Sequence, residues 1–145
     1  MRLRFKENAI PEMKENPLIY FDGKENKGKW KEIFENEEIS RIYLNFSTPW
    51  PKRRHHKRRL SHERFLNRYK NIIKDKAVLE LKTDNKELYE ASVKYFEEFS
   101  MDIIEKDENI SEEKSKYISE YERKFRNKNM PIYYIKARFN KWIFQ

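Results

Sequence analysis

The chain has 145 residues, a formal net charge of +8 and no cysteine. This length predicts one domain, and the missing cysteines exclude disulfides and thiolate metal sites. The excess of basic residues predicts a polyanionic partner. No segment has the length of a membrane span, and the N-terminus lacks the apolar core of a signal peptide, so we expect a soluble, cytoplasmic protein.

The first third of the chain predicts an arm, a strand and a loop. Residues 1–38 show no sustained hydrophobic period, so we expect an irregular arm that wraps the surface, with one short extended run at 18–21. Residues 41–46 are nearly continuous in apolar side chains, as in a strand buried on both faces. Two prolines within residues 47–54 then exclude helix and strand, and predict a loop.

The middle of the chain predicts a helix, a strand and a second helix. Ser61 can cap the first helix, which is expected to extend through Ile73. Its apolar stripe consists of Phe65, Leu66, Tyr69, Ile72 and Ile73. Residues 77–83 alternate as a second strand, and Asp84 or Asn85 can cap the next helix.

The last part of the chain predicts a third strand from Met101, a charged mobile loop at 105–116 and a helix around 117–126. A final strand follows Pro131. Alternating strands and helices are typical of a parallel α/β sheet, whose ligands bind beyond the carboxyl ends of the strands. The loops that start at Ser47 and Thr83 should therefore lie on one functional edge.

One domain is expected, with three parts. Residues 1–38 form the arm, residues 39–139 the α/β core and residues 140–145 an aromatic tail of unassigned role.

The strongest functional signal is a basic run. Six Lys or Arg occur in the eight residues from Lys52 to Arg59, with His55 and His56 among them. Guanidinium groups on a loop suit phosphate backbones, and Trp50 could stack on a base. The alternative is a solvated basic face, with Trp50 covering the sheet edge. Two adjacent histidines without acidic neighbours do not predict a metal site.

Two shorter motifs lie at the predicted starts of helices. In LKTDN, Asp84 could accept hydrogen bonds from a base edge, or it could only cap a helix. In SEYE, Ser119 and Glu122 fit a capping box. The chain has two glycines, Gly23 and Gly28, and neither can form the glycine-rich turn that holds a nucleotide-type cofactor.

The stretch YLNFSTPWPKRRHHKRRL resembles the TrmB family, the bacterial tRNA (guanine-N7-)-methyltransferases, whose pattern is N-F-S-D-P-W-P-K-x-R-H-x-K-R-R-L. The resemblance continues through FLNRYKNII, LELKTDN and SEYERKFRNKNMPIYYIKARF, and includes the opening MRLRFKENA. It covers nearly the whole chain. It implies a truncated Rossmann-like methyltransferase sheet of about four strands, in the order 4-5-7-6, with flanking helices.

The resemblance also implies roles for particular residues. Lys52 and Asp84 are substrate contacts. The substrate segment T-x-[FY]-E is matched by Ser119, Glu120, Tyr121 and Glu122. The segment that interacts with tRNA is matched by Arg54, His55, His56, Lys57, Arg58 and Arg59. The implied partner is tRNA, and the implied cofactor is S-adenosylmethionine.

Two departures from the family pattern concern catalysis. Thr48 stands where the family has its catalytic aspartate, and a threonine cannot act as a carboxylate base. The family's long block between the arm and the LYLNFSD strand, which holds the glycine motif and three strands, is absent. Two functions follow as alternatives. Either the chain is a tRNA-binding protein without its own donor site, or it is a minimal methyltransferase completed by its arm or by a second subunit.

Removing three strands leaves residues 41–46 as an apolar sheet edge. Unpaired edges recruit other strands. We therefore expect that the arm covers this edge, or that a homodimer or a paralogue pairs with it.

Overall fold

The computed structural model describes residues 3–4, 18–21 and 39–140. Its six-stranded sheet has the order β1-β2-β3-β4-β6-β5. The strands are β1 (Leu3–Arg4), β2 (Leu18–Phe21), β3 (Ile39–Asn45), β4 (Ile73–Thr83), β5 (Asp102–Asp107) and β6 (Tyr133–Arg138). The helices are a 3₁₀ helix η2 (Arg53–Arg58), α2 (Glu63–Tyr69), α3 (Lys86–Glu98) and α4 (Glu120–Asn127).

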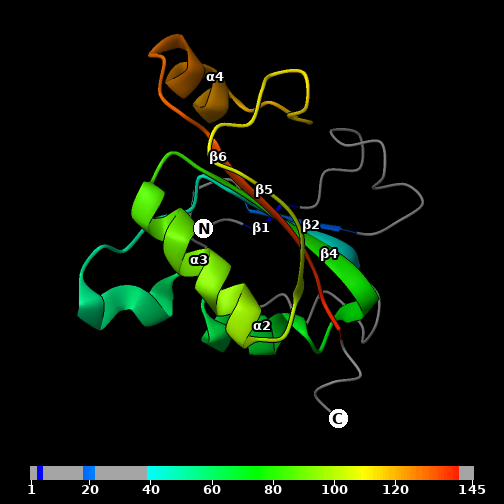
Figure 1. Cartoon of the computed structure of the whole chain (residues 1–145). Coiled ribbons are helices and arrows are strands. Elements are labelled where there is room, and N and C mark those ends of the chain that lie inside the picture. Colours follow the sequence, from blue (N-terminus) through cyan, green and yellow to red (C-terminus); the bar gives the residue numbers. More distant parts are fainter. Residues whose placement is uncertain (1–2, 5–17, 22–38, 141–145) are drawn as a thin grey trace.

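The four strands β3-β4-β6-β5 confirm the predicted order 4-5-7-6 of a truncated Rossmann-like sheet. β3 and β4 run parallel, whereas β6 is antiparallel to both of its neighbours. The sheet is therefore mixed rather than all parallel. In Figure 1, α4 lies beyond the end of the sheet instead of covering a face, so the chain enters β6 from the edge where β4 ends.

The arm covers the exposed edge of β3. β2 pairs with β3 in parallel, with Leu18 opposite Arg41 and Phe21 opposite Leu44, and β1 then pairs with β2. The predicted extended run at 18–21 is confirmed, and so is the predicted pairing of the arm with this edge. A homodimer or a paralogue joined through residues 41–46 would have to displace β2. The rest of the predicted arm at 1–38, apart from residues 3–4 and 18–21, and residues 141–145 of the predicted tail lie outside the described residues.

The hydrophobic core lies between the sheet and the helices α2 and α3, which cover one face (Figure 1). Ile42 and Leu44 of β3 are fully buried there, and Leu66 of α2 and Phe96 of α3 pack into the same cluster. Because side chains alternate along a strand, the other face carries polar residues such as Arg41 and Glu80, which form an ion pair of 3.2 Å. Within the described ranges, no helix is long and apolar enough to cross a membrane.

The first predicted helix is shorter than expected. α2 ends at Tyr69, and Ile73 belongs to β4, where it pairs with Ile39. The cap is also different: the His62 ring accepts from the Arg64 N–H, while the Ser61 hydroxyl is buried against that of Ser92. Ile73 is therefore part of a strand, although its spacing from Phe65, Leu66 and Tyr69 also fits one face of a helix. At the other end of the sheet, β5 extends to Asp107, into the predicted loop.

The helix α3 begins with an asparagine cap. The Asn85 side chain accepts a hydrogen bond of 2.8 Å from the Leu88 N–H, and this contact decides between Asn85 and Asp84. Replacing Asn85 with alanine is expected to cost about 1 kcal/mol in the free energy of unfolding. Asp84→Ala is the matched control and should leave stability within about 0.5 kcal/mol. Urea denaturation of both variants checks this, and an equal loss would refute the assignment.

Candidate functional site

The carboxyl ends of β3 and β4 meet at one edge, as the sequence predicts. The Phe46 N–H donates to the Lys82 carbonyl over 2.8 Å and continues the pairing past the strand. The backbone then leaves the sheet through a strained loop: Phe46 has φ of 54° and Trp50 of 45°, both in the left-handed region that bulky residues avoid. Thr48 lies exposed within this loop.

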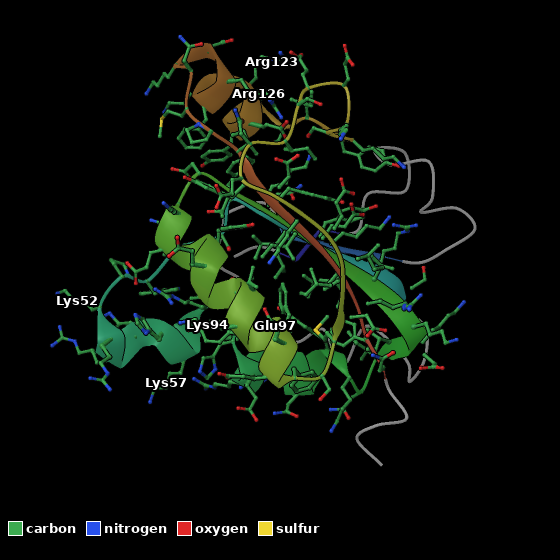
Figure 2. The ribbon with its side chains drawn as sticks, viewed as in Figure 1. Lys52, Lys57, Lys94, Glu97, Arg123 and Arg126 are labelled. Carbon is green, nitrogen blue, oxygen red and sulfur yellow. The ribbon has the colours of Figure 1, made fainter. Side chains whose placement is uncertain are left out.

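Residues Arg53–Arg58 of the basic run form the 3₁₀ helix η2 and not an irregular loop. Several of its cations are exposed and have no carboxylate partner among the described residues: Lys52, Arg53, Arg54, Lys57 and Arg58. Lys52 and Lys57 reach away from the body of the protein in Figure 2. The Arg58 guanidinium lies 5.1 Å from the centre of the Trp50 ring, a cation–π contact.

The histidines of the run take part in local contacts. The His55 ring meets Trp50 edge-on at 5.6 Å, and desolvation together with the charges of Arg58 and Arg54 lowers its pKa. His56 Nε2 lies 3.2 Å from the Pro51 carbonyl. The described residues contain no cluster of three metal-ligating side chains.

Arg59, predicted to contact RNA, is buried with 1% of its surface exposed. Its Nε donates to the Pro49 carbonyl over 2.7 Å. Its two terminal nitrogens donate to the Tyr95 hydroxyl and to Glu87 Oε1, over 3.1 and 2.9 Å. The guanidinium therefore joins the strained loop to α3.

The LKTDN motif forms the turn between β4 and α3. The Thr83 hydroxyl accepts from the Asn85 N–H over 3.1 Å, and Asn85 caps the helix. Asp84 lies between them, partly exposed, and within the described residues no hydrogen bond or ion pair occupies its carboxylate. Its carboxylate is therefore available to a ligand.

The SEYE motif begins α4. The Ser119 hydroxyl accepts from the Glu122 N–H over 3.1 Å, as half of a capping box. The Glu122 side chain does not return to Ser119. Instead it is fully buried and accepts from Lys82 Nζ, Ser115 Oγ and Arg126 Nε at 2.9, 2.7 and 2.8 Å. Glu122 is therefore fully engaged inside the protein, and Glu120 is exposed.

Glu122 and Lys82 form a buried ion pair. Burial alone would raise the pKa of the Glu122 carboxyl, but the hydrogen bonds from Ser115 and Lys82 outweigh it and hold the pKa below its ordinary value of 4.5. Burial lowers the pKa of Lys82, and Glu122 opposes that shift. Three donors around one carboxylate indicate that Glu122 is ionised.

Tyr121 brings the α4 motif to the same edge. Its ring is 48% exposed and stacks on Phe46, with 6.4 Å between ring centres and 22° between planes. Phe46 follows directly after β3, and Lys82 of β4 holds Glu122. The structure thus places the loop after β3, the LKTDN turn and the SEYE motif around the carboxyl ends of two neighbouring strands.

The polar face of the sheet has a pocket of about 330 Å³. Five cationic and three acidic side chains line it, together with Tyr43 and Tyr134: Arg41, Lys82, Lys114, Lys116, Lys136, Glu80, Glu105 and Glu113. Asn45 of β3 pairs with Lys82 of β4, which lines this pocket. The Asn45 side-chain oxygen is buried without a hydrogen-bond partner among the described residues. No described residue is a glycine.

The burial of Arg59 and the pairing of Lys82 with Glu122 were missed from the sequence. Lys82 gave no signal of burial, because the alternation of the strand places it with Glu80 on the polar face, where a lysine is usually exposed. Arg59 gave no signal. Its partners Glu87 and Tyr95 lie 28 and 36 residues further along the chain.

Comparison with known proteins identifies the relatives of this chain. A family described as "Putative methyltransferase" matches residues 19–135. A tRNA (guanine-N(7)-)-methyltransferase of Oceanobacillus iheyensis is 45% identical over 137 residues, 92% of this chain and 64% of that protein. Proteins of the same name from Clostridium botulinum strain 657 and Staphylococcus epidermidis RP62A are 47% and 44% identical, over 74% and 76% of this chain.

The chain spans about half to two-thirds of the length of these relatives, with coverage of 64%, 50% and 52%. The matched residues include both parallel strands β3 and β4 and the motifs around their ends. Because most of the chain is matched, it belongs to the TrmB family of tRNA (guanine-N7-)-methyltransferases.

Proposed function

We propose that this chain binds tRNA at the carboxyl ends of β3 and β4 and does not bind the methyl donor by itself. The observation that carries the binding half is the set of exposed cations on and before η2, which no carboxylate within the described residues neutralises. Unpaired guanidinium and ammonium groups release counterions when they meet phosphates, and this release favours binding of a nucleic acid.

The reactive base has a candidate position between the two motifs. Asp84 offers a free carboxylate at the end of β4, and a carboxylate accepts hydrogen bonds from base amino groups. The half-exposed Tyr121 ring offers a stacking surface at the end of β3. Both are residues for which the family resemblance implies substrate contact.

S-adenosylmethionine does not fit the residues that the structure describes. A nucleotide-type cofactor needs a close backbone approach at a strand-to-helix turn, and the β4–α3 turn is Thr83-Asp84-Asn85, without glycine. The pocket on the polar face is lined by five cationic and three acidic side chains, so the charge of its lining is positive, and a sulfonium ion is itself cationic. No step of methyl transfer is therefore assigned to this chain alone.

Two titrations of the purified chain test the proposal. Fluorescence anisotropy should show saturable binding of unmodified tRNA, with an affinity that falls steeply as the salt concentration rises. Calorimetry should show no saturable heat on addition of S-adenosylmethionine, and labelled methyl groups should not reach tRNA. Donor binding with transfer would establish the minimal methyltransferase instead. Failure to bind tRNA would refute the first half of the proposal.

A further inference from the structure

The geometry of η2 sorts the basic run into rows. A 3₁₀ helix has three residues per turn, so side chains at positions i and i+3 lie on the same side. Arg53, His56 and Arg59 form one row, of which His56 and Arg59 approach α3 and Arg53 is exposed. His55 and Arg58 form the second row, and both contact Trp50. The third row consists of Arg54 and Lys57.

Two members of the first row, His56 and Arg59, are engaged within the protein. Glu87 of α3 accepts from Arg59 over 2.9 Å and lies 3.8 Å from His56 Nε2. Arg59 has further acceptors in Pro49 and Tyr95, so each of the three nitrogens of its guanidinium has an acceptor. With 1% exposure, Arg59 presents no donor to a ligand.

The third row is free for a ligand. Arg54 and Lys57 are both exposed, and neither forms an ion pair with a described carboxylate. Arg54 Nε makes a single contact of 3.4 Å, with the His55 ring, which is long for a hydrogen bond. Their charges therefore remain available to phosphates.

The strained loop explains why a buried guanidinium is needed. Phe46 and Trp50 both hold positive φ angles, a conformation that persists only where the surroundings enforce it. The Phe46 end is held by the Lys82 carbonyl. The Trp50 end is held through its neighbour Pro49, whose carbonyl accepts from Arg59.

We propose that Arg59 is a positioning residue, which fixes the loop and η2 on α3, and that the exposed cations of the run, Arg54 and Lys57 among them, are its phosphate contacts. This inference rests on the proposed tRNA binding. It gives the arginines of one basic run two different roles. Arg54 contacts the RNA directly, whereas Arg59 affects RNA binding only through the position of the loop.

The decisive variant is Glu87→Gln. If Arg59 bound phosphate itself, removing its competing carboxylate would free the guanidinium and tighten tRNA binding. If Arg59 positions the loop, the same change weakens binding threefold or more, although it removes a negative charge. Because the Glu87 side chain is 59% exposed, the variant is expected to fold. Fluorescence anisotropy titrations of tRNA at several salt concentrations distinguish the two possibilities.

A pair of matched variants completes the test. Arg54→Met should weaken binding and reduce the slope of log affinity against log salt by about one. Arg59→Met removes the same charge, and its effect should not add to that of Glu87→Gln, whereas the effects of Arg54→Met and Glu87→Gln should add. Additivity for Arg59, or tighter binding by Glu87→Gln, would overturn the inference.

Hydrogen exchange tests the positioning role of Arg59 independently of tRNA binding. Arg59→Met should speed exchange of amides in residues 47–58, and Arg54→Met should not. If the wild-type chain failed to bind tRNA while exchange responded in this way, the proposed function would be wrong and the positioning role would stand. Unchanged exchange in Arg59→Met would refute the positioning role, whatever the RNA measurements show.

Discussion

Replacing Glu122 with glutamine is expected to lower the free energy of unfolding by about 3–5 kcal/mol. Glu122 is fully buried and accepts hydrogen bonds from Lys82, Ser115 and Arg126. Glutamine keeps the shape but loses the charge, so the Lys82 ammonium, 4% exposed, loses the charge of the carboxylate that it donates to. Since small domains are stable by about 5–15 kcal/mol, urea denaturation should show a large shift of the midpoint.

The exposed Glu120, two residues earlier, is the matched control. Glu120→Gln removes one charge from the first turn of the same helix and should cost less than about 1 kcal/mol. The double variant Lys82→Met with Glu122→Gln removes both charges of the pair and should recover part of the loss. If Glu122→Gln cost no more than Glu120→Gln, the buried pair would have no role in stability.

The same pair predicts a dependence on pH. The pKa of Glu122 is lower in the folded chain than its ordinary value of 4.5. Its contribution to stability is therefore complete above about pH 4.5 and is lost as the pH falls through the folded-state pKa. The stability difference between the wild type and Glu122→Gln should stay constant from pH 7 to 5 and shrink below that range. Denaturation at several pH values measures it.

The triple variant Lys52→Ala, Arg54→Ala and Lys57→Ala is expected to weaken tRNA binding on the order of a hundredfold at low salt. All three side chains are exposed, and Lys52 and Lys57 extend into solvent (Figure 2). Loss of three phosphate contacts should also reduce the salt slope by about two to three. Stability should hardly change, because the side chains form no ion pair within the described residues.

A second triple variant controls for net charge. Lys74, Lys106 and Lys128 are equally exposed but lie at the start of β4, on β5 and after α4, away from η2. Replacing them with alanine gives the same net charge and should weaken binding by less than about threefold. Equal losses in the two triple variants would mean that binding depends on total charge and not on the basic run.

The sheet could be predicted from the sequence because its signals are local. The run at 41–46 and the alternation at 77–83 each mark a strand directly, and both strands are present in β3 and β4. Boundaries were less accurate: Ile73 fits a helical stripe as well as a strand, and only its pairing with Ile39 decides. The family resemblance supplied the strand order, which no local pattern contains.

The sequence predicted where the candidate site lies, but not which of its charged side chains are exposed and which are bound within the protein. The sequence shows that Arg54 and Arg59 are both arginines in a basic run, and nothing local distinguishes them. The difference arises because α3 places Glu87 and Tyr95 beside one of them. In the same way, Glu122 matches a substrate motif, yet its carboxylate is occupied by Lys82, 40 residues earlier in the chain.

The parallel pairing of β2 with β3 has a consequence for how such proteins change during evolution. Backbone groups are alike in every residue, so any extended segment of suitable length and direction can complete a ladder, as residues 18–21 do here. A cofactor site instead needs particular side chains and glycines at particular positions. A sheet shortened at this edge can therefore keep its fold through a simple substitution of one strand for another. The fold at this edge thus depends on backbone pairing, whereas the chemistry depends on particular side chains.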